Sequence, residues 1–381
     1  MTDIENLRRT EFPWTERAEV SYLNHAGTGP LPARTVRALH EWDCVRAEPW
    51  RNTAKEQFGV LARSRELCAR MIGATPDEIA MTVNTSYGLN VAASSMPLKA
   101  GDVIVTPDRE FPANVYPWMA LAERRGLTYR RLACVDGLAD EDALIRALDE
   151  PNVKVLSVSW VSFETGLKLD LARLGTACRA RGIFFVVDAI QGIGAAPIDV
   201  HACNIDFLAC GGQKWLLSPW GTGFLYVRRE LVQKLIPHTV SWMAVKNAED
   251  FTQLCNYELN WFDNARRFEL ITLPYQEFAG LNASLELFES VGWQRVHQLV
   301  EERATQIVDW ARRRGDVRLV TPADPSRRAG VVAIRPDNPV ETSARLFANG
   351  VPHALREGMI RLAPHFYTSP EEIDRATRAL A

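Results

Sequence analysis

Short apolar runs alternate with longer amphipathic stretches over much of the chain, the pattern of strands followed by helices. The predicted strands cover residues 79–83, 103–106, 128–132, 153–159, 183–187, 207–209 and 224–227. The predicted helices between them cover residues 87–95, 113–125, 141–148 and 171–181. Because this alternation is typical of βαβ units, we expect an α/β fold with a parallel, doubly wound sheet.

The pattern differs on either side of this region. Residues 20–24 look extended, and residues 33–72 predict a long, interrupted helical region. After about residue 273 the helical stretches are longer, at 276–290 and 293–314. Short strands at 317–320 and 331–335 and helices at 340–348 and 370–380 follow. We therefore expect a large domain of residues 20–272 and a small C-terminal α/β domain of residues 273–381, joined by residues 1–19.

Two of the predicted strands lead into polar residues that a buried strand would not choose for packing. The first is followed by Asp188, and the second runs through two glycines to Lys214. Ligands of open α/β sheets bind outside the carboxyl ends of the strands. A lysine and a carboxylate there suit pyridoxal 5'-phosphate, since the lysine forms a Schiff base and the carboxylate pairs with the pyridine nitrogen. Either residue alone could be a helix cap, a turn residue or a solvated charge, but the pair favours the cofactor.

Two segments around these residues carry a family resemblance. Residues 188–191 read Asp-Ala-Ile-Gln, and residues 211–224 read Gly-Gly-Gln-Lys-Trp-Leu-Leu-Ser-Pro-Trp-Gly-Thr-Gly-Phe. They resemble the cofactor signature of the class V aminotransferase family of pyridoxal-phosphate enzymes, in particular its cysteine desulfurase and isopenicillin N epimerase branch. The resemblance extends from about Tyr22 to the C-terminus. It implies the fold-type I architecture, with a mainly parallel seven-stranded sheet, a small α/β domain and a homodimer.

Further cofactor contacts follow from the resemblance. Thr85 and Ser86 lie where a predicted strand turns into a helix, whose free amides and dipole suit a phosphate; the resemblance gives them that role. Phe111 falls where the desulfurase branch has a histidine stacked on the cofactor ring. A phenylalanine can stack there, but it cannot transfer a proton.

Three polar residues are predicted around the rest of the cofactor. Gln191 corresponds to a glutamine that reaches the phenol oxygen side of the ring. An asparagine of the desulfurase pattern is replaced by Phe163, so Ser162 is the alternative partner of that oxygen. Gln213 stands where desulfurases have a histidine, and it can still donate to phosphate.

Four further residues are predicted to contact the substrate or the second subunit of a homodimer. The resemblance implies that Arg361 binds the substrate α-carboxylate, since the guanidinium fork can bind both carboxylate oxygens. Arg356 is a second candidate for this group, and His25 is a possible substrate contact that is also compatible with a purely structural role. By resemblance, Thr272 reaches across a homodimer and completes the partner's phosphate site.

The composition excludes some classes of binding partner but does not indicate which reaction the protein catalyses. The chain has 381 residues, 24% of them charged, and a formal net charge of -3. Since no basic block or acidic tail occurs, we expect no nucleic-acid and no membrane partner. The N-terminus is polar, so we expect no signal peptide. The seven cysteines are scattered, which predicts reduced thiols in the cytoplasm and no metal site.

The expected chemistry begins with Lys214 as cofactor anchor and general base, with Asp188 maintaining the electron sink. The last cysteine, Cys255, precedes the predicted small domain, which disfavours a desulfurase with a persulfide-forming cysteine there. The leading hypothesis is an aminotransferase-like enzyme acting at the α-carbon of an amino acid. A C–S or C–Se β-eliminating lyase, an epimerase and a non-catalytic cofactor-binding module are the alternatives. A nicotinamide-dependent dehydrogenase is disfavoured because no GxGxxG follows the first strand.

Overall fold

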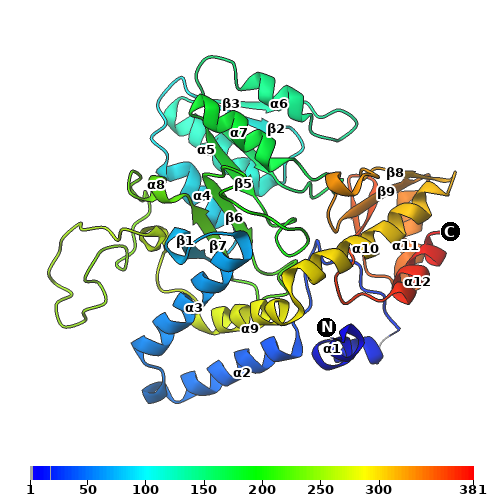
Figure 1. The fold of residues 1–381 in the computed structure, drawn as a ribbon, viewed down its shortest axis with the longest axis horizontal. Helices are drawn as coiled ribbons and strands as arrows, with labels where there is room; N and C mark the ends of the chain where they lie inside the picture. The colour runs from blue at the N-terminus through cyan, green and yellow to red at the C-terminus, as the bar shows by residue number, and fades with distance from the viewer. Residues whose placement is uncertain (1–2, 18) are drawn as a thin grey trace.

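The computed structural model describes residues 3–17 and 19–381, and its centre is a seven-stranded sheet (Figure 1). The strand order is β1-β7-β6-β5-β4-β2-β3. The bounds are β1 Ile79–Thr82, β2 Val103–Pro107, β3 Thr128–Leu132, β4 Val153–Ser159, β5 Phe184–Asp188, β6 Phe207–Gly211 and β7 Gly223–Val227. β7 runs in the opposite direction to the other strands of this sheet and pairs antiparallel with β1 and β6. The predicted doubly wound, mainly parallel sheet is therefore confirmed.

The central strands are apolar on both sides because helices cover both faces of the sheet. In β6, Phe207 and Ala209 belong to one hydrophobic cluster, while Leu208 and Cys210 belong to another on the opposite face. Such strands alternate between two cores rather than between core and solvent. At the far edge of the sheet, β3 carries charged residues, which discourages pairing with another chain.

The helices of the large sheet begin and end at recognisable signals. Asn84, Asp140 and Asp170 cap α4, α6 and α7 with their side chains. Gly126 and Gly182 end α5 and α7 with positive φ values of 65° and 63°. The bounds are α2 Ala33–Ala47, α3 Ala54–Ile72, α4 Thr85–Ser95, α5 Tyr116–Arg125, α6 Glu141–Ala147, α7 Leu171–Arg181 and α8 Arg229–Val232.

A second, antiparallel sheet forms near the C-terminus, with the order β10-β11-β9-β8. The bounds are β8 Val317–Leu319, β9 Val332–Pro336, β10 Ala354–Arg356 and β11 Met359–Leu362, with α10 Trp293–Arg312, α11 Pro339–Ala348 and α12 Pro370–Leu380 as the helices. The β10–β11 hairpin was not predicted. Its two turn residues, Glu357 and Gly358, have φ values of 47° and 74°, as a tight two-residue hairpin loop requires.

The predicted domain limits remain a prediction, and the packing bears on them at both ends. Helix α9 (Tyr275–Val291) packs against α2 and α3, which favours a boundary at its C-terminal end rather than at residue 273. Helix α1 (Ile4–Glu11) joins the small domain through an ion pair of 3.2 Å between Arg8 and Glu372. Figure 1 accordingly shows α1 on the same side of the molecule as α12 and the small sheet. Residues 1, 2 and 18 of the predicted N-terminal part lie outside the described residues.

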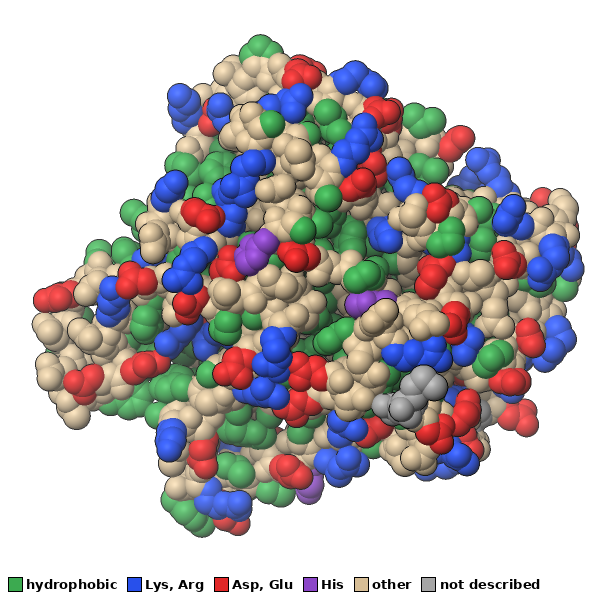
Figure 2. Space-filling view, viewed as in Figure 1, with side chains coloured by type: hydrophobic (Ala, Val, Ile, Leu, Met, Phe, Trp, Pro, Cys, Tyr) green, Lys and Arg blue, Asp and Glu red, His purple; other side chains and the backbone are tan. Residues whose placement is uncertain are grey.

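The surface carries both signs of charge. On the face in Figure 2, basic and acidic side chains are intermixed over both sheets' helices. Across the part of the chain that the structure describes, no helix combines the length and apolarity needed to cross a membrane.

Candidate active site

The ends of β5 and β6 bring the predicted acid and lysine to the same edge of the large sheet. Asp188, the last residue of β5, pairs with Ala209 of β6, and Lys214 follows three residues after the end of β6. The Asp188 side chain is buried, and one of its oxygens accepts a hydrogen bond of 3.1 Å from the Ile190 amide. Parallel strand pairing thus places a buried carboxylate next to the segment that carries the lysine.

Burial disfavours the charged form of both groups. It raises the pKa of Asp188 to about 6, against the Ile190 hydrogen bond and the positive charge of Lys214. It lowers the pKa of Lys214 to about 8; Asp188 opposes this effect, whereas Arg361 adds to it. A lysine with a pKa near 8 has a substantial fraction of neutral, nucleophilic amine close to neutral pH.

Two aromatic rings lie beside this lysine. The Lys214 Nζ is 5.5 Å from the centre of the Phe111 ring, which is 42% exposed. Phe163 meets Phe111 edge to face, with 5.3 Å between ring centres. Phe111 therefore offers an accessible flat face next to the amine, while Phe163 supports the ring from the side.

The start of α4 and the end of β6 are joined by a hydrogen bond. The Thr85 hydroxyl oxygen accepts from the Gly211 amide at 2.9 Å, and Ser86 beside it is exposed. A β-carbon on residue 211 would lie 2.5 Å from the Gln213 side-chain oxygen and 3.3 Å from the Thr85 hydroxyl. Thr85, Gly211 and Gln213 thus converge closely, and a side chain at position 211 would require the Gln213 side chain to move.

Gln191 and Ser162 are engaged with the protein itself. The Gln191 amide nitrogen donates to the Ala26 carbonyl at 3.0 Å, and its oxygen accepts from the Trp215 indole at 2.9 Å. The Ser162 oxygen accepts from two backbone amides in the loop that follows it. Each side chain keeps one proton to donate, on the Gln191 nitrogen and on the Ser162 hydroxyl.

Arg361 is a buried cation on β11. Its Nη1 donates to the Phe163 carbonyl at 2.8 Å, whereas its Nε is buried without a hydrogen-bond partner. Burial, followed by the like charge of Arg356, lowers the pKa of Arg361 to about 10. Arg356 is exposed at the end of β10 and donates to its neighbour's carbonyl, Leu355. Arg361 therefore has an unmet donor in the interior, which an anionic ligand could satisfy.

His25, a possible substrate contact, has both ring nitrogens bonded to protein atoms, which favours the structural role. The ring is fully buried, with Nδ1 bonded to the Ala363 carbonyl at 2.7 Å and Nε2 to the Tyr367 hydroxyl at 2.6 Å. No ring nitrogen remains for a substrate. The physical reason is that residues 20–25 run beside the small domain, so the histidine connects the two parts of the fold.

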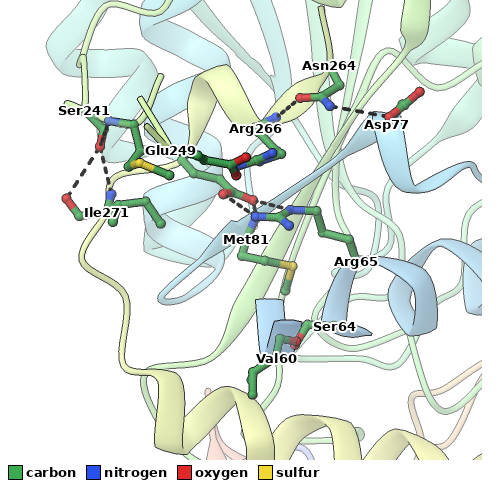
Figure 3. A network of polar contacts seen from close by, with 12 residues as sticks. Val60, Ser64, Arg65, Asp77, Met81, Ser241, Glu249, Asn264, Arg266 and Ile271 are labelled. Carbon is green, nitrogen blue, oxygen red and sulfur yellow. Dashed lines mark hydrogen bonds and ion pairs between the residues drawn. The ribbon is translucent and has the colours of Figure 1, made fainter. Parts of the chain in front are cut away.

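Thr272 lies on the surface, just before α9. It is exposed and lines a hollow with Trp42, Phe58 and Tyr275. The preceding residue, Ile271, donates its amide to the Ser241 hydroxyl oxygen at 3.1 Å (Figure 3). The role of Thr272 toward another subunit stays a prediction.

Comparison with known proteins identifies the family. The family described as Aminotransferase class-V matches residues 21–349, most of the chain. The chain belongs to the class V aminotransferase family. The predicted pyridoxal-phosphate enzyme is thereby confirmed at the level of the family.

Relatives of this class V chain carry names for different reactions. It is 30% identical over 327 residues to an uncharacterized aminotransferase, YcbU, of Bacillus subtilis, covering 86% of this chain and 85% of that protein. It is 30% identical over 377 residues to isopenicillin N epimerase of Streptomyces clavuligerus, covering 94% and 93%. A probable cysteine desulfurase of Methanothermobacter thermautotrophicus is 32% identical, over 73% of this chain and 68% of that protein. The family thus fixes the cofactor class but not the reaction.

Solved structures agree on the fold. A lysine-to-alanine variant of C-DES, with glycine covalently linked to its PLP cofactor, superimposes with a TM-score of 0.89, at 24% identity, over 100% of this chain and 99% of that one. A complex of the cystine C-S lyase C-DES with cysteine persulfide gives 0.87, at 24% identity, over 96% and 98%. At this identity the likeness concerns architecture, and it confirms the predicted class V fold.

The site of this class V chain fits pyridoxal phosphate on its own geometry. The orphaned Nε of Arg361 and the exposed Phe111 face beside Lys214 each offer a ligand a contact that the protein itself does not fill. An amine with a lowered pKa and a buried carboxylate supply the two charges that the cofactor ring needs.

Sequence reasoning gave no role to one residue of this class V site, Glu110. Its carboxylate accepts hydrogen bonds from the amide and hydroxyl of Ser159, the residue opposite Asp188 in the sheet. The signal was its position directly before Phe111, but only the strand pairing shows what it contacts.

Proposed function

We propose that this protein is a pyridoxal-phosphate enzyme that acts at the α-carbon of an amino acid, with an aminotransferase-like reaction as the leading candidate. The observation that carries the proposal is the buried pair at adjacent strand ends, Asp188 and the segment of Lys214, with the pKa of the lysine lowered to about 8. When bound, pyridoxal phosphate would supply an electron sink for the electrons of a broken α-carbon bond.

Lys214 and Asp188 have different roles in the proposed reaction. Lys214 would hold the cofactor aldehyde through its neutral amine. Once the substrate amine has replaced it there, the freed amine would move the proton at the substrate α-carbon. Asp188 holds a proton on the pyridine nitrogen. Its carboxylate is acidic enough, with a pKa of about 6, to be anionic at neutral pH, and a pyridinium partner would lower that value further.

The surrounding residues would bind the cofactor and orient its ring. Thr85, Ser86 and Gln213 would hold the phosphate, where the α4 amides and the close approach at Gly211 favour an anion. Phe111 would stack on the ring. The remaining protons of Gln191 and Ser162 would face the phenol oxygen side.

Arg361 would bind the substrate carboxylate. A carboxylate that reached its orphaned Nε would form a charge-assisted bond in a site with little water. Arg356 adds positive potential at the same edge, since it lowers the pKa of both Lys214 and Arg361.

We further propose a cytoplasmic homodimer in which Thr272 of one subunit completes the phosphate site of the other. The exposure of Thr272 in a surface hollow supports an action between subunits. All seven cysteines are free, which agrees with a reducing compartment.

Epimerisation is the second candidate, favoured by the relative named isopenicillin N epimerase, which matches 94% of this chain. A persulfide-forming desulfurase is disfavoured because no cysteine follows Cys255 in the sequence. A direct C–S or C–Se lyase needs no such thiol and remains a further alternative.

A spectral screen tests the proposal. Purified protein is mixed with individual L- and D-amino acids while its visible absorption is recorded, and keto acid, ammonia, sulfide and the opposite enantiomer are measured as products. Keto acid formed with conversion of the cofactor to its amine form supports transamination, whereas enantiomer alone supports epimerisation. A cofactor-bound protein that gives no spectral change and no product with any amino acid would overturn the enzymatic proposal in favour of a non-catalytic binding module.

A further inference from the structure

Beyond Lys214 and Asp188, a third titratable group is built into the same strand ends. Glu110 lies in the turn after β2, and its carboxylate receives the Ser159 amide at 2.7 Å and the Asn114 side-chain amide at 3.0 Å. It also makes a short contact with the Ser159 hydroxyl. Ser159 ends β4 directly opposite Asp188, whose own carbonyl accepts from the Trp160 amide at 2.9 Å.

The hydrogen bonds around Glu110 have a fixed direction. The Asn114 side-chain oxygen accepts from the Trp118 indole at 3.1 Å and from the Ser157 hydroxyl at 2.6 Å, so its nitrogen must point to Glu110 and donate. The Ser159 amide can only donate as well. Only the Ser159 hydroxyl can reverse, donating to an ionised Glu110 or accepting from a protonated one. The network therefore accepts Glu110 in both protonation states without losing a bond.

The position of Glu110 ties this network to the predicted cofactor platform. Phe111 is the next residue, and its carbonyl accepts from the Asn114 amide at 2.8 Å. The turn of residues 110–114 is thus held from both sides of Phe111, by the end of β4 and by α5 through Trp118. We therefore expect the Phe111 ring, which lies next to Lys214, to keep its orientation whether or not a cofactor is bound.

We propose that Glu110 is a positioning residue of this site, which anchors the Phe111 turn to the end of β4 and shares the negative charge of the strand ends with Asp188. This inference rests on the proposed cofactor site. No metal-ligating or redox chemistry is involved, and the only covalent change is the gain or loss of one proton at Glu110.

The electrostatic surroundings of Glu110 support the proposed sharing of negative charge with Asp188. Burial raises the pKa of Glu110 to about 7, against the bonds from Ser159 and Asn114, and the negative charge of Asp188 raises it further. On the β3 side, Tyr129 is bonded to Thr106 and stays neutral. The neighbouring Arg109 is paired with Glu164 at 2.6 Å, and the charge of Asp188 acts on Glu110 in addition to burial.

The experiment compares Glu110→Gln and Ser159→Ala with the wild type, and uses Glu123→Gln, an exposed glutamate of α5, as the matched control. Ser159 and Asn114 donate to different oxygens of Glu110, so in Glu110→Gln the NH2 group replaces one acceptor and faces another donor. The turn therefore loses one bond and the site loses one negative charge. Ser159→Ala removes only the hydroxyl contact, and this milder change keeps the test valid if Glu110→Gln does not fold. Two measurements are made on each protein.

The first measurement is a pH titration of the visible band of the holoenzyme. Loss of nearby negative charge disfavours the proton on the nitrogen that links lysine and cofactor, so its midpoint should fall by about half a pH unit or more in Glu110→Gln and by less in Ser159→Ala. The second is tryptophan fluorescence of the apoprotein between pH 5 and 9, on the order of two units on either side of the Glu110 pKa. Because Asp188 and Lys214 also titrate in this range, the expected result is a change near neutral pH that is reduced in Glu110→Gln and retained in Glu123→Gln.

The results distinguish a failure of the inference about Glu110 from a failure of the proposed function. If borohydride traps the cofactor on Lys214 but both variants titrate like the wild type, Glu110 has no positioning role and the proposed function stands. If no cofactor is trapped on wild-type Lys214, the proposed function itself fails, whatever the fluorescence shows. Equal midpoint shifts in Glu110→Gln and Glu123→Gln would also overturn the inference, because they would reflect the total charge rather than this network.

Discussion

Replacing Arg361 by methionine should stabilise the empty protein while weakening its substrate binding. The guanidinium is 3% exposed and has a pKa of about 10 instead of its usual 12.5. Because the pKa of this base is lowered, the folded chain disfavours the charged form by roughly 3 kcal/mol at every pH well below 10. Methionine removes that cost and roughly preserves the buried length of the side chain.

Part of the gain is offset by the lost hydrogen bond from the charged guanidinium to the Phe163 carbonyl, worth on the order of 1.5–3 kcal/mol. The free energy of unfolding of the apoprotein should therefore rise by up to about 1.5 kcal/mol, measured by urea denaturation at pH 7. Arg335→Met serves as the control, since Arg335 is exposed on the neighbouring strand β9 and should change stability by less than about 0.5 kcal/mol.

The functional effect has the opposite sign. A charge-assisted bond to a carboxylate contributes on the order of 1.5–3 kcal/mol, so KM for an amino acid should rise roughly ten- to a hundredfold in Arg361→Met. Lysine at this position should rescue poorly because it cannot form a forked contact. The decarboxylated amine of the same amino acid should bind equally to the wild type and the variant. If the variant weakens the acid and the amine alike, or if it destabilises the apoprotein by about 2 kcal/mol or more, our account of Arg361 is wrong.

Three further predictions concern the lysine, the aspartate and the buried histidine. Lys214→Ala should lose the borohydride-reducible link to the cofactor, whereas Lys234→Ala, at an exposed position, should keep it; a retained link in Lys214→Ala would move the anchor elsewhere. Asp188→Ala should reduce turnover by about two to four orders of magnitude with cofactor still bound, and near-normal turnover would exclude the pyridine contact. Burial lowers the pKa of His25 to about 4, below its usual 6.5, so the unfolded chain binds the extra proton and stability should fall as pH drops from about 6.5 to about 4. The loss from this one group is on the order of 3 kcal/mol, and urea denaturation of His25→Gln should show a correspondingly weaker acid dependence than the wild type.

The sequence by itself determined the large sheet and the pair at its edge. Strands such as β4 and β5 are recognisable because burial on both faces selects a continuous apolar run, a property of a few adjacent residues. Asp188 and Lys214 stood out because polar residues interrupt such runs only at the strand ends. The start of α4 was recognisable for the same local reason, since Asn84 is a helix-capping residue.

The small domain and the surroundings of the site were decided by the tertiary structure. The β10–β11 hairpin has strands of three and four residues, too short for a periodic signal, and it is stabilised by pairing of β11 with β9. The structure also decided that His25 is buried against Tyr367 and that Arg361 contacts Phe163, which lies 198 positions away in the sequence. Burial and charge at these residues depend on which distant segments pack around them, and no local pattern encodes that packing. The residue types therefore indicated the chemistry, whereas the pKa values and the free hydrogen-bond donors that the chemistry needs arise only in the folded chain.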